Sequence, residues 1–103
     1  MHALIVTAHV DQHSHTHNIV SQVAQGIDAG CHSYEIADLA AEQFDPRFNQ
    51  ADFEQFKIVA PSPADVVAEQ QRLDRTDALV LVYPIYWWSF PGQLKGWIDR
   101  VFT

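Results

Sequence analysis

The order of apolar and mixed segments along the chain predicts three parallel strands connected by helices. The apolar run within residues 2–9, the alternating segment 32–37 and the apolar run 78–83 have the length and the β-branched content of strands. Segments with apolar residues at helical spacing separate these strands and follow the last of them. Because strands that alternate with helices form right-handed crossovers, the pattern favours an α/β fold with a parallel sheet.

The connections between these strands differ in regularity. After the first strand, apolar residues recur at helical spacing over residues 19–27, and Gly30 is the natural stop for this helix. Residues 40–63 contain three prolines and one short helical segment at 51–56, so they predict an extended excursion after the second strand. Helical spacing then resumes over residues 64–75 and leads into the third strand.

A last helix is predicted after Pro91, which fits the first helical turn with Ser89 or Phe90 at the capping position. Its apolar positions follow the i, i+3, i+4, i+7 and i+8 spacing of one helix face: Leu94, Trp97, Ile98, Val101 and Phe102. We therefore expect Trp97 and Ile98 to lie in the core rather than in a binding site.

Composition narrows the class of protein. With 103 residues, 48% of them apolar, residues 1–103 are expected to form one domain. Lysine and arginine number 6 against 13 acidic residues, which gives a net charge of −7 and argues against nucleic acid as a partner. No stretch approaches the ~20 apolar residues of a membrane span, and no positively charged leader is present, so a cytoplasmic location is expected. Cys31 is the single cysteine, which excludes an internal disulfide.

The loop after the first strand is the first candidate binding site, because ligands of open parallel sheets bind at the carboxyl ends of the strands. Residues 10–18 contain no glycine, so the dinucleotide-binding fingerprint is absent. Ser14 and Thr16 instead place hydroxyl groups at the start of a helix, where they and the free backbone N–H groups suit a phosphate. The alternative for Ser14 is a helix cap alone.

Four histidines lie close together in the same part of the chain: His9, His13, His15 and His17. His13 and His17 would share a helix face if the helix began early, and this spacing can hold a metal ion. No second histidine cluster follows, so we favour His9 facing a phosphate, with the others solvated or lining the ligand. No Ser/His/Asp or Cys/His constellation for nucleophilic catalysis is discernible.

A second candidate site is the loop between the third strand and the last helix. It carries Tyr86, Trp87 and Trp88, an aromatic cluster at a place where a loop is ordinarily polar. The alternative for the two tryptophans is an ordinary core or dimer contact.

Three sequence motifs, together with a serine-containing loop that enters a helix, carry a resemblance to a known family. Strand one ends in TAH, EIADLAAEQFDPRF includes the end of strand two, and YPIYWWSFPGQLKGWIDRVF begins at the end of strand three. The chain resembles the flavodoxin-like NAD(P)H:quinone oxidoreductases, which include mammalian DT-diaphorase, the bacterial modulator of drug activity and the potassium-efflux ancillary proteins. The resemblance covers essentially the whole chain. It implies a flavodoxin-like three-layer sandwich with a parallel sheet, of which only the N-terminal part is present.

The resemblance also implies a cofactor and substrates. A flavin, FAD or FMN, would bind at the carboxyl ends of the strands, accept hydride from NAD(P)H and reduce a quinone-like acceptor. The family's phosphate-binding loop corresponds to His9, His13, Ser14, His15 and Thr16, of which His13 and His15 depart from the commonest residues. The loop that borders the flavin ring corresponds to Pro84, Ile85, Tyr86, Trp87 and Trp88. A planar redox ring needs such apolar walls and backbone donors.

Family members continue beyond the motif at which this chain ends, so catalytic residues are not assigned. A three-stranded parallel sheet leaves an unprotected edge, and we expect either a piece of a longer polypeptide or a chain completed by a partner subunit. The resemblance implies a homodimer. A catalytically incomplete flavin-binding or regulatory subunit is the main alternative function, and a histidine-rich metal-binding module is the weaker one.

Overall fold

A computed structural model describes residues 1–57, 61–85 and 90–102. Its elements, in chain order, are β1 (His2–Thr7), α1 (His15–Ala29), β2 (Ser33–Asp38), α2 (Gln50–Phe56), α3 (Ala64–Asp74), β3 (Ala78–Val82) and α4 (Gly92–Val101). Within the described ranges the strands form one parallel sheet in the order β2-β1-β3. The predicted α/β fold with a parallel sheet is therefore confirmed. No helix in these ranges is long and apolar enough to cross a membrane.

The central strand β1 is buried on both faces from Ala3 onward, which explains why its sequence is almost continuously apolar. Its register is regular: Thr7 aligns with Asp38 of β2 and with Val82 of β3. The carboxyl ends of the three strands therefore stand side by side at one edge. Any loop that leaves β1, β2 or β3 begins at this edge.

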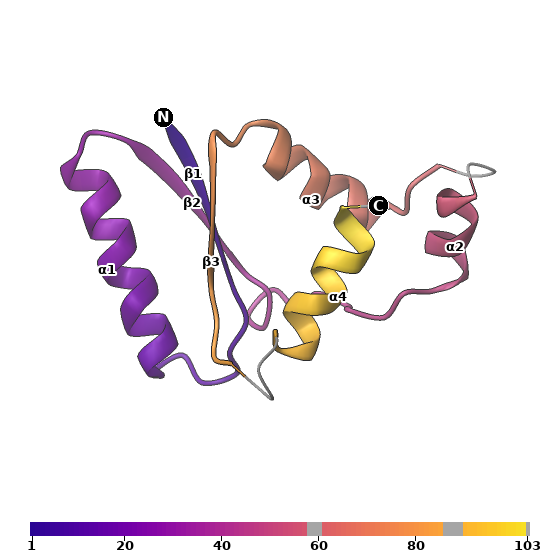
Figure 1. The fold of residues 1–103 in the computed structure, drawn as a ribbon, viewed down its shortest axis with the longest axis horizontal. Helices are drawn as coiled ribbons and strands as arrows, with labels where there is room; N and C mark the ends of the chain where they lie inside the picture. The colour runs from indigo at the N-terminus through magenta and orange to yellow at the C-terminus, as the bar shows by residue number, and fades with distance from the viewer. Residues whose placement is uncertain (58–60, 86–89, 103) are drawn as a thin grey trace.

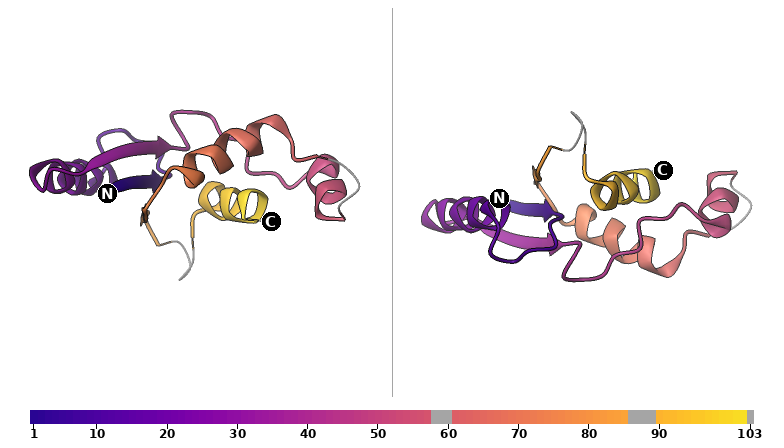
Figure 2. Two further views of the ribbon diagram at one scale, coloured as in Figure 1. Left: turned by 90° about the horizontal axis from the view of Figure 1, so that it is seen from above. Right: turned by 90° about the horizontal axis from the view of Figure 1, so that it is seen from below.

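Helices cover the two faces of the sheet as separate layers (Figures 1 and 2). On one face Ile5 of β1 packs with Val20 and Ala24 of α1. On the other face alternate β1 residues pack with α4, in a cluster formed by Leu4, Val6, Ala8, Ala37, Leu39, Leu94, Trp97 and Val101. The three-layer arrangement expected from the resemblance is thus present. Trp97 is fully buried, as the sequence predicts.

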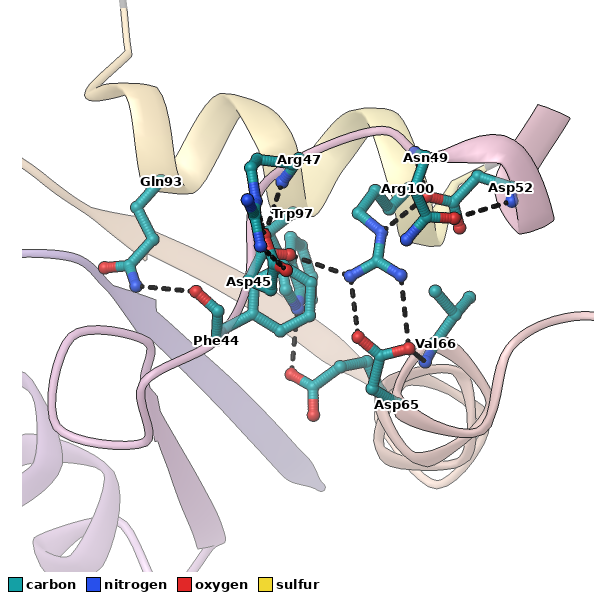
Figure 3. A network of polar contacts seen from close by, with 11 residues as sticks. Phe44, Asp45, Arg47, Asn49, Asp52, Asp65, Val66, Gln93, Trp97 and Arg100 are labelled. Atoms are coloured by element: carbon teal, nitrogen blue, oxygen red, sulfur yellow. Dashed lines mark hydrogen bonds and ion pairs between the residues drawn. The ribbon is translucent and has the colours of Figure 1, made fainter.

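The segment between β2 and α3 extends away from the sheet and carries α2, which lies at the right-hand end of the molecule in Figure 1, opposite α1. A capping box between Asn49 and Asp52 starts α2. Arg100 of α4 reaches this segment, and its buried guanidinium donates to Asp52 (2.8 Å), to the carbonyl of Asp45 (2.7 Å) and to Asp65 (2.6 Å) (Figure 3). The excursion is therefore attached to the body through α4.

Some features around α4 differ from those predicted from the sequence. Pro91 is the N-cap residue, with ψ of 149°, rather than a first-turn residue, and among the described residues no side chain caps this helix. The prediction of Phe90 as the cap is wrong, and Ser89 lies outside the described residues. Phe102 follows the helix as its C-cap and is 54% exposed, although its ring packs edge-on against Trp97 at 5.5 Å. The apolar face is therefore one residue shorter than the spacing indicates.

Candidate functional site

The loop after β1 meets the start of α4 at the carboxyl edge of the sheet. The segment after β1 and the start of α4 line one cleft of about 120 Å³, formed by Ala8, His9, Val10, Pro91 and Gln93. A larger polar cavity of about 330 Å³ opens over the first turns of α1, lined by Gln12, His13, Ser14, His17, Asn18 and Ser21. Figure 1 shows the segment after β1 at the end of the sheet where β3 also ends. A ligand at this edge would contact segments about 80 residues apart.

His9 stands at the beginning of this loop with a fixed hydrogen-bonding role. Its Nδ1 accepts the backbone N–H of Asp11 at 3.0 Å. A neutral imidazole that accepts at Nδ1 must carry its proton on Nε2, so Nε2 is a hydrogen-bond donor. His9 is half-buried. It can therefore offer one N–H group to an anion at the strand end.

The N-terminus of α1 adds further donors. Ser14 is the N-cap, and its hydroxyl oxygen accepts the N–H of His17 at 3.2 Å. The amides of His15 and Thr16 have no acceptor within the helix, because the first-turn N–H groups never do. No acidic residue occupies the first turn, so no carboxylate of that turn competes for the helix's positive end. Thr16 is buried, whereas Ser14 is half-buried, so Ser14 offers the more accessible hydroxyl.

His17 makes more contacts than the sequence suggests. Its Nε2 lies 2.9 Å from Asp38 Oδ2, and its Nδ1 lies 3.0 Å from Ser14 Oγ and 2.9 Å from the carbonyl oxygen of Asp11. Ser14, His17 and Asp38 thus form a connected chain of contacts that was not discernible in the sequence. The Ser14 oxygen also accepts the amide of His17, which is the contact of a helix cap.

Asp38 is stabilised as a carboxylate. Burial raises the pKa of Asp38, but hydrogen bonds from the backbone of Ala41 and from the side chains of His17 and Gln12 outweigh it and hold this pKa below its usual value. The sequence signal for this contact is weak. Asp38 directly follows the buried Ala37 at the end of β2, and only the register of the sheet brings it opposite Thr7.

The predicted histidine cluster does not converge on one point in the described part of the chain. No three His, Cys, Asp or Glu side chains are grouped there for a metal ion. His13 and His15 are exposed, and both ring nitrogens of His17 lie within hydrogen-bonding distance of other groups. Among the described residues, the histidine that lies beside His17 is His9, with ring centroids 6.2 Å apart.

The loop after β3 is described on both of its sides. Pro84 is half-buried and Ile85 is 70% exposed. Beyond the loop, the ring of Phe90 packs against Tyr83 at 4.9 Å. Tyr86, Trp87 and Trp88, which the sequence predicts as walls of the site, lie outside the described residues. The base of this loop is thus held by an aromatic pair.

Gln93 fixes the start of α4 near the site. Its side-chain amide donates to the carbonyl oxygens of Leu39 (2.9 Å) and Phe44 (3.0 Å), and the second of these bonds is visible in Figure 3. Both acceptors lie in the segment that follows β2. The cleft residue Gln93 therefore ties the carboxyl edge of β2 to the loop after β3.

Taken together, a parallel sheet, a serine-capped helix after β1 and a cleft between the segment after β1 and the start of α4 define an α/β protein with a candidate ligand site at its strand ends. The chain belongs to the family described as having the flavodoxin-like fold, whose model matches residues 1–103.

Known proteins with related sequences and structures include quinone reductases. The chain superimposes with a TM-score of 0.95 and 34% identity on an NAD(P)H:quinone oxidoreductase from Methanothermobacter marburgensis, covering 100% of this chain and 54% of that one. NAD(P)H dehydrogenase [quinone] 1 of Cavia porcellus is 29% identical over 98% of this chain and 42% of its own length. The general stress protein 14 of Treponema denticola, solved in complex with FMN, matches with a TM-score of 0.66 and 26% identity, over 100% of this chain and 49% of its own.

These similarities confirm the family resemblance drawn from the three sequence motifs. The chain spans about half the length of the relatives it matches.

Proposed function

We propose that this chain forms the flavin-binding part of an NAD(P)H:quinone oxidoreductase. The observation that carries the proposal is the shared cleft between the segment after β1 and the start of α4, on a fold that matches quinone reductases along its whole length. Bound there, FMN or FAD would supply the chemistry, by taking hydride from NAD(P)H and delivering reducing equivalents to a quinone-like acceptor. An FMN complex of a structural relative supports a flavin.

The loop after β1 would hold the phosphate end of the cofactor. Nε2–H of His9, the hydroxyl of Ser14 and the amides of His15 and Thr16 supply donors without any lysine or arginine, and the first basic residue of that kind in the chain is Arg47. The positive end of α1 therefore carries much of the attraction for an anion. His13 is exposed beside the cavity over α1 and would line the same anion.

The loop after β3 would wall the ring. The proposed wall residues are Pro84, Ile85, Tyr86, Trp87 and Trp88. Their role would be to exclude water and to orient the ring by apolar contact and by backbone hydrogen bonds. The Tyr83–Phe90 ring pair would keep the two ends of this loop in place.

The family resemblance further supports a homodimer in the cytoplasm. Because the chain matches only about half the length of its relatives, a flavin-binding subunit without turnover is the second candidate. Sedimentation of the flavin-loaded chain would report the oligomeric state. Flavin retention without oxidation of NADH or NADPH would favour the second candidate.

The direct test is reconstitution. The purified chain would be mixed with FMN or FAD, freed of unbound flavin and examined for the visible flavin absorption band, then for bleaching by NADH or NADPH and recovery with a quinone. Retained flavin that is bleached and recovers is expected. Loss of both flavins on gel filtration would contradict the proposal. Stoichiometric zinc in a colourless protein would instead favour the histidine-rich metal-binding module.

A further inference from the structure

His17 connects three parts of the site: the loop after β1, the cap of α1 and the end of β2. We propose that His17, held by Asp38, is a positioning residue that decides whether the Ser14 hydroxyl proton is available to a bound phosphate, and so makes phosphate binding by this loop depend on pH. The inference rests on the proposed function, because it assigns the same loop to the phosphate of a flavin. It adds a role for Asp38, which the sequence alone does not single out, and gives His17 a specific one.

The hydrogen bond with Asp38 fixes one side of the ring. A carboxylate only accepts hydrogen bonds, so the 2.9 Å contact between Nε2 and Asp38 Oδ2 requires a proton on Nε2 in either charge state of the ring. The two side chains are 12% and 16% exposed, so this contact is largely shielded from solvent. The ring nitrogen that differs between the two charge states of His17 is therefore Nδ1.

Nδ1 faces two oxygens, and its proton decides how they are used. When Nδ1 is protonated, it donates to the Asp11 carbonyl oxygen (2.9 Å) or to Ser14 Oγ (3.0 Å), and both oxygens act as acceptors. The hydroxyl proton of Ser14 is then free to point at a ligand oxygen. When Nδ1 is bare, it accepts the Ser14 hydroxyl proton, so Ser14 has none left for a phosphate.

The neutral ring also leaves the loop less well held. A bare Nδ1 stands 2.9 Å from the Asp11 carbonyl oxygen with no proton between them, and two lone pairs at this distance repel. The Asp11 carbonyl accepts the N–H of Ser14 at 3.1 Å, so any displacement of Asp11 would also disturb Ser14, the N-cap of α1. Both effects weaken anion binding as the ring loses its proton.

The charged and titratable neighbours of His17 favour this role. Asp38 contacts it from β2, and Gln12 and the backbone of Ala41 hold that carboxylate in place. From the loop after β1, the ring of His9 lies edge-on at 6.2 Å, and the carboxylate of Asp11 accepts the backbone N–H of His13 at 2.9 Å. A protonated His17 thus adds positive charge to a loop that contains no lysine or arginine.

A purely structural role would have a different signature. If His17 only attached α1 to β2, its loss would reduce stability, and flavin affinity would change by the same factor at every pH. The matched variant is His17→Gln, whose amide N–H can still donate to Asp38 while its carbonyl oxygen, like a bare Nδ1, can accept the Ser14 hydroxyl proton at every pH. His32→Gln is the control, because His32 is exposed and follows α1 at the opposite end of the sheet.

The experiment measures dissociation constants for FMN and FAD with the full chain and both variants, between about pH 5.5 and 8.5 where histidine titrates. The phosphate of FMN itself titrates at about pH 6. That effect is common to all three proteins, so it cancels in the ratios of their dissociation constants. We expect His17→Gln to bind about tenfold more weakly than the wild type near the acidic limit, an effect typical of one hydrogen bond to a charged group, and nearly equally at the basic limit. His32→Gln should follow the wild type.

Riboflavin, which has the ring but no phosphate, separates the loop from the ring site. Its affinity ratio between wild type and His17→Gln should not change with pH. A ratio for FMN and FAD that is constant over the whole range would overturn the inference, as would an equal pH effect with riboflavin.

If the wild type binds no flavin, the proposed function fails, and inorganic phosphate then decides the inference. Phosphate should shift the NMR signals of the His15 and Thr16 amides, and it should do so at lower concentrations in the wild type than in His17→Gln at acidic pH only. Absence of such shifts, or equal midpoints in both proteins at every pH, would overturn it.

Discussion

Gly96 of α4 and Pro46 of the excursion lie so close together that no side chain fits between them. A Cβ atom at Gly96 would overlap the carbonyl oxygen and the Cβ of Pro46, and it would stand 2.7 Å from the Cα. Gly96 is buried and helical, so its advantage is space rather than backbone freedom. This contact explains why a weak helix former stands in the middle of α4.

Gly96→Ala should lower the free energy of unfolding by about 1–3 kcal/mol, because the helix and the excursion must separate to admit one methyl group. Urea denaturation would measure the change. Gly26→Ala in α1 is the matched control, since nothing lies within 4 Å of a Cβ there. The control should leave stability unchanged or raise it by up to about 1 kcal/mol. Equal effects of the two substitutions would disprove the close contact.

Arg100→Leu should cost about 3–5 kcal/mol, because it leaves the buried carboxylate of Asp52 without its partner. Burial lowers the pKa of Arg100, but the hydrogen bonds and charges of Asp65 and Asp52 outweigh it and raise this pKa, so the guanidinium is charged at every ordinary pH. Arg47→Leu is the control, because Arg47 pairs with Asp45 at the surface and should matter little. Thermal unfolding of both variants compares them directly.

Acidification should remove the contribution of Asp38 to stability. Its pKa is lower in the folded protein than the ordinary value of 3.8, so the stabilisation is complete above the unfolded-state pKa and is lost as the pH falls through the folded-state pKa. Asp38→Asn should therefore be less stable than the wild type near about pH 6, with a difference that shrinks below about pH 4. The exposed Asp74 provides the control substitution Asp74→Asn. A difference that stays constant down to the acid limit would exclude the ionised contact.

Ser14→Ala should weaken flavin binding about five- to tenfold by removing one hydroxyl donor, and it should lower stability by about 1 kcal/mol by removing the α1 cap. Asn49→Ala removes the cap of α2 and should reproduce the loss of stability alone. Fluorescence titration with flavin and thermal unfolding would be measured on both variants. A Ser14→Ala protein with normal flavin content and lowered thermal stability would leave Ser14 as a cap only.

Trp87→Ala should weaken flavin retention with little effect on folding, because a site wall contributes apolar contact to the ring rather than to the core. Trp97→Phe should instead lower the stability of the fold with little effect on flavin retention. Trp97 is fully buried and its Nε1 donates to the carboxylate of Glu69 at 2.9 Å. The substitution removes this donor, so the buried Glu69 carboxylate loses one hydrogen bond. Unchanged flavin affinity in Trp87→Ala would reject its role as a wall.

The sequence predicts well what depends on local pattern. The strands β1 and β3 and the helices α1, α3 and α4 follow from apolar runs and helical spacing, with errors of a few residues at their ends. Burial of charged residues was not predictable in this way. Arg100 and Glu69 are buried against hydrogen-bonding partners that lie 48 and 28 residues away along the chain. The periodicity of the sequence contains no information about such distant contacts.

The same distinction between local pattern and long-range contact applies to the candidate site. Ser14 could be found from its position at a helix start, and His9 from its position after a strand. The contact between His17 and Asp38 could not, because it spans 21 residues and depends on the register that aligns Asp38 with Thr7. The aromatic walls Tyr86, Trp87 and Trp88 remain a prediction from sequence.

The attachment of the excursion to α4 has a consequence for biosynthesis. The backbone of Asp45, the ring of Pro46 and the carboxylate of Asp52 all meet residues of α4, which are about 50 positions further along the chain. A growing polypeptide cannot form these contacts until residue 100 has left the ribosome. The pairing of β1 with β2 needs only the first 38 residues. During translation the sheet can therefore begin to assemble early, while the segment around α2 must wait for the last helix before it is fixed in place.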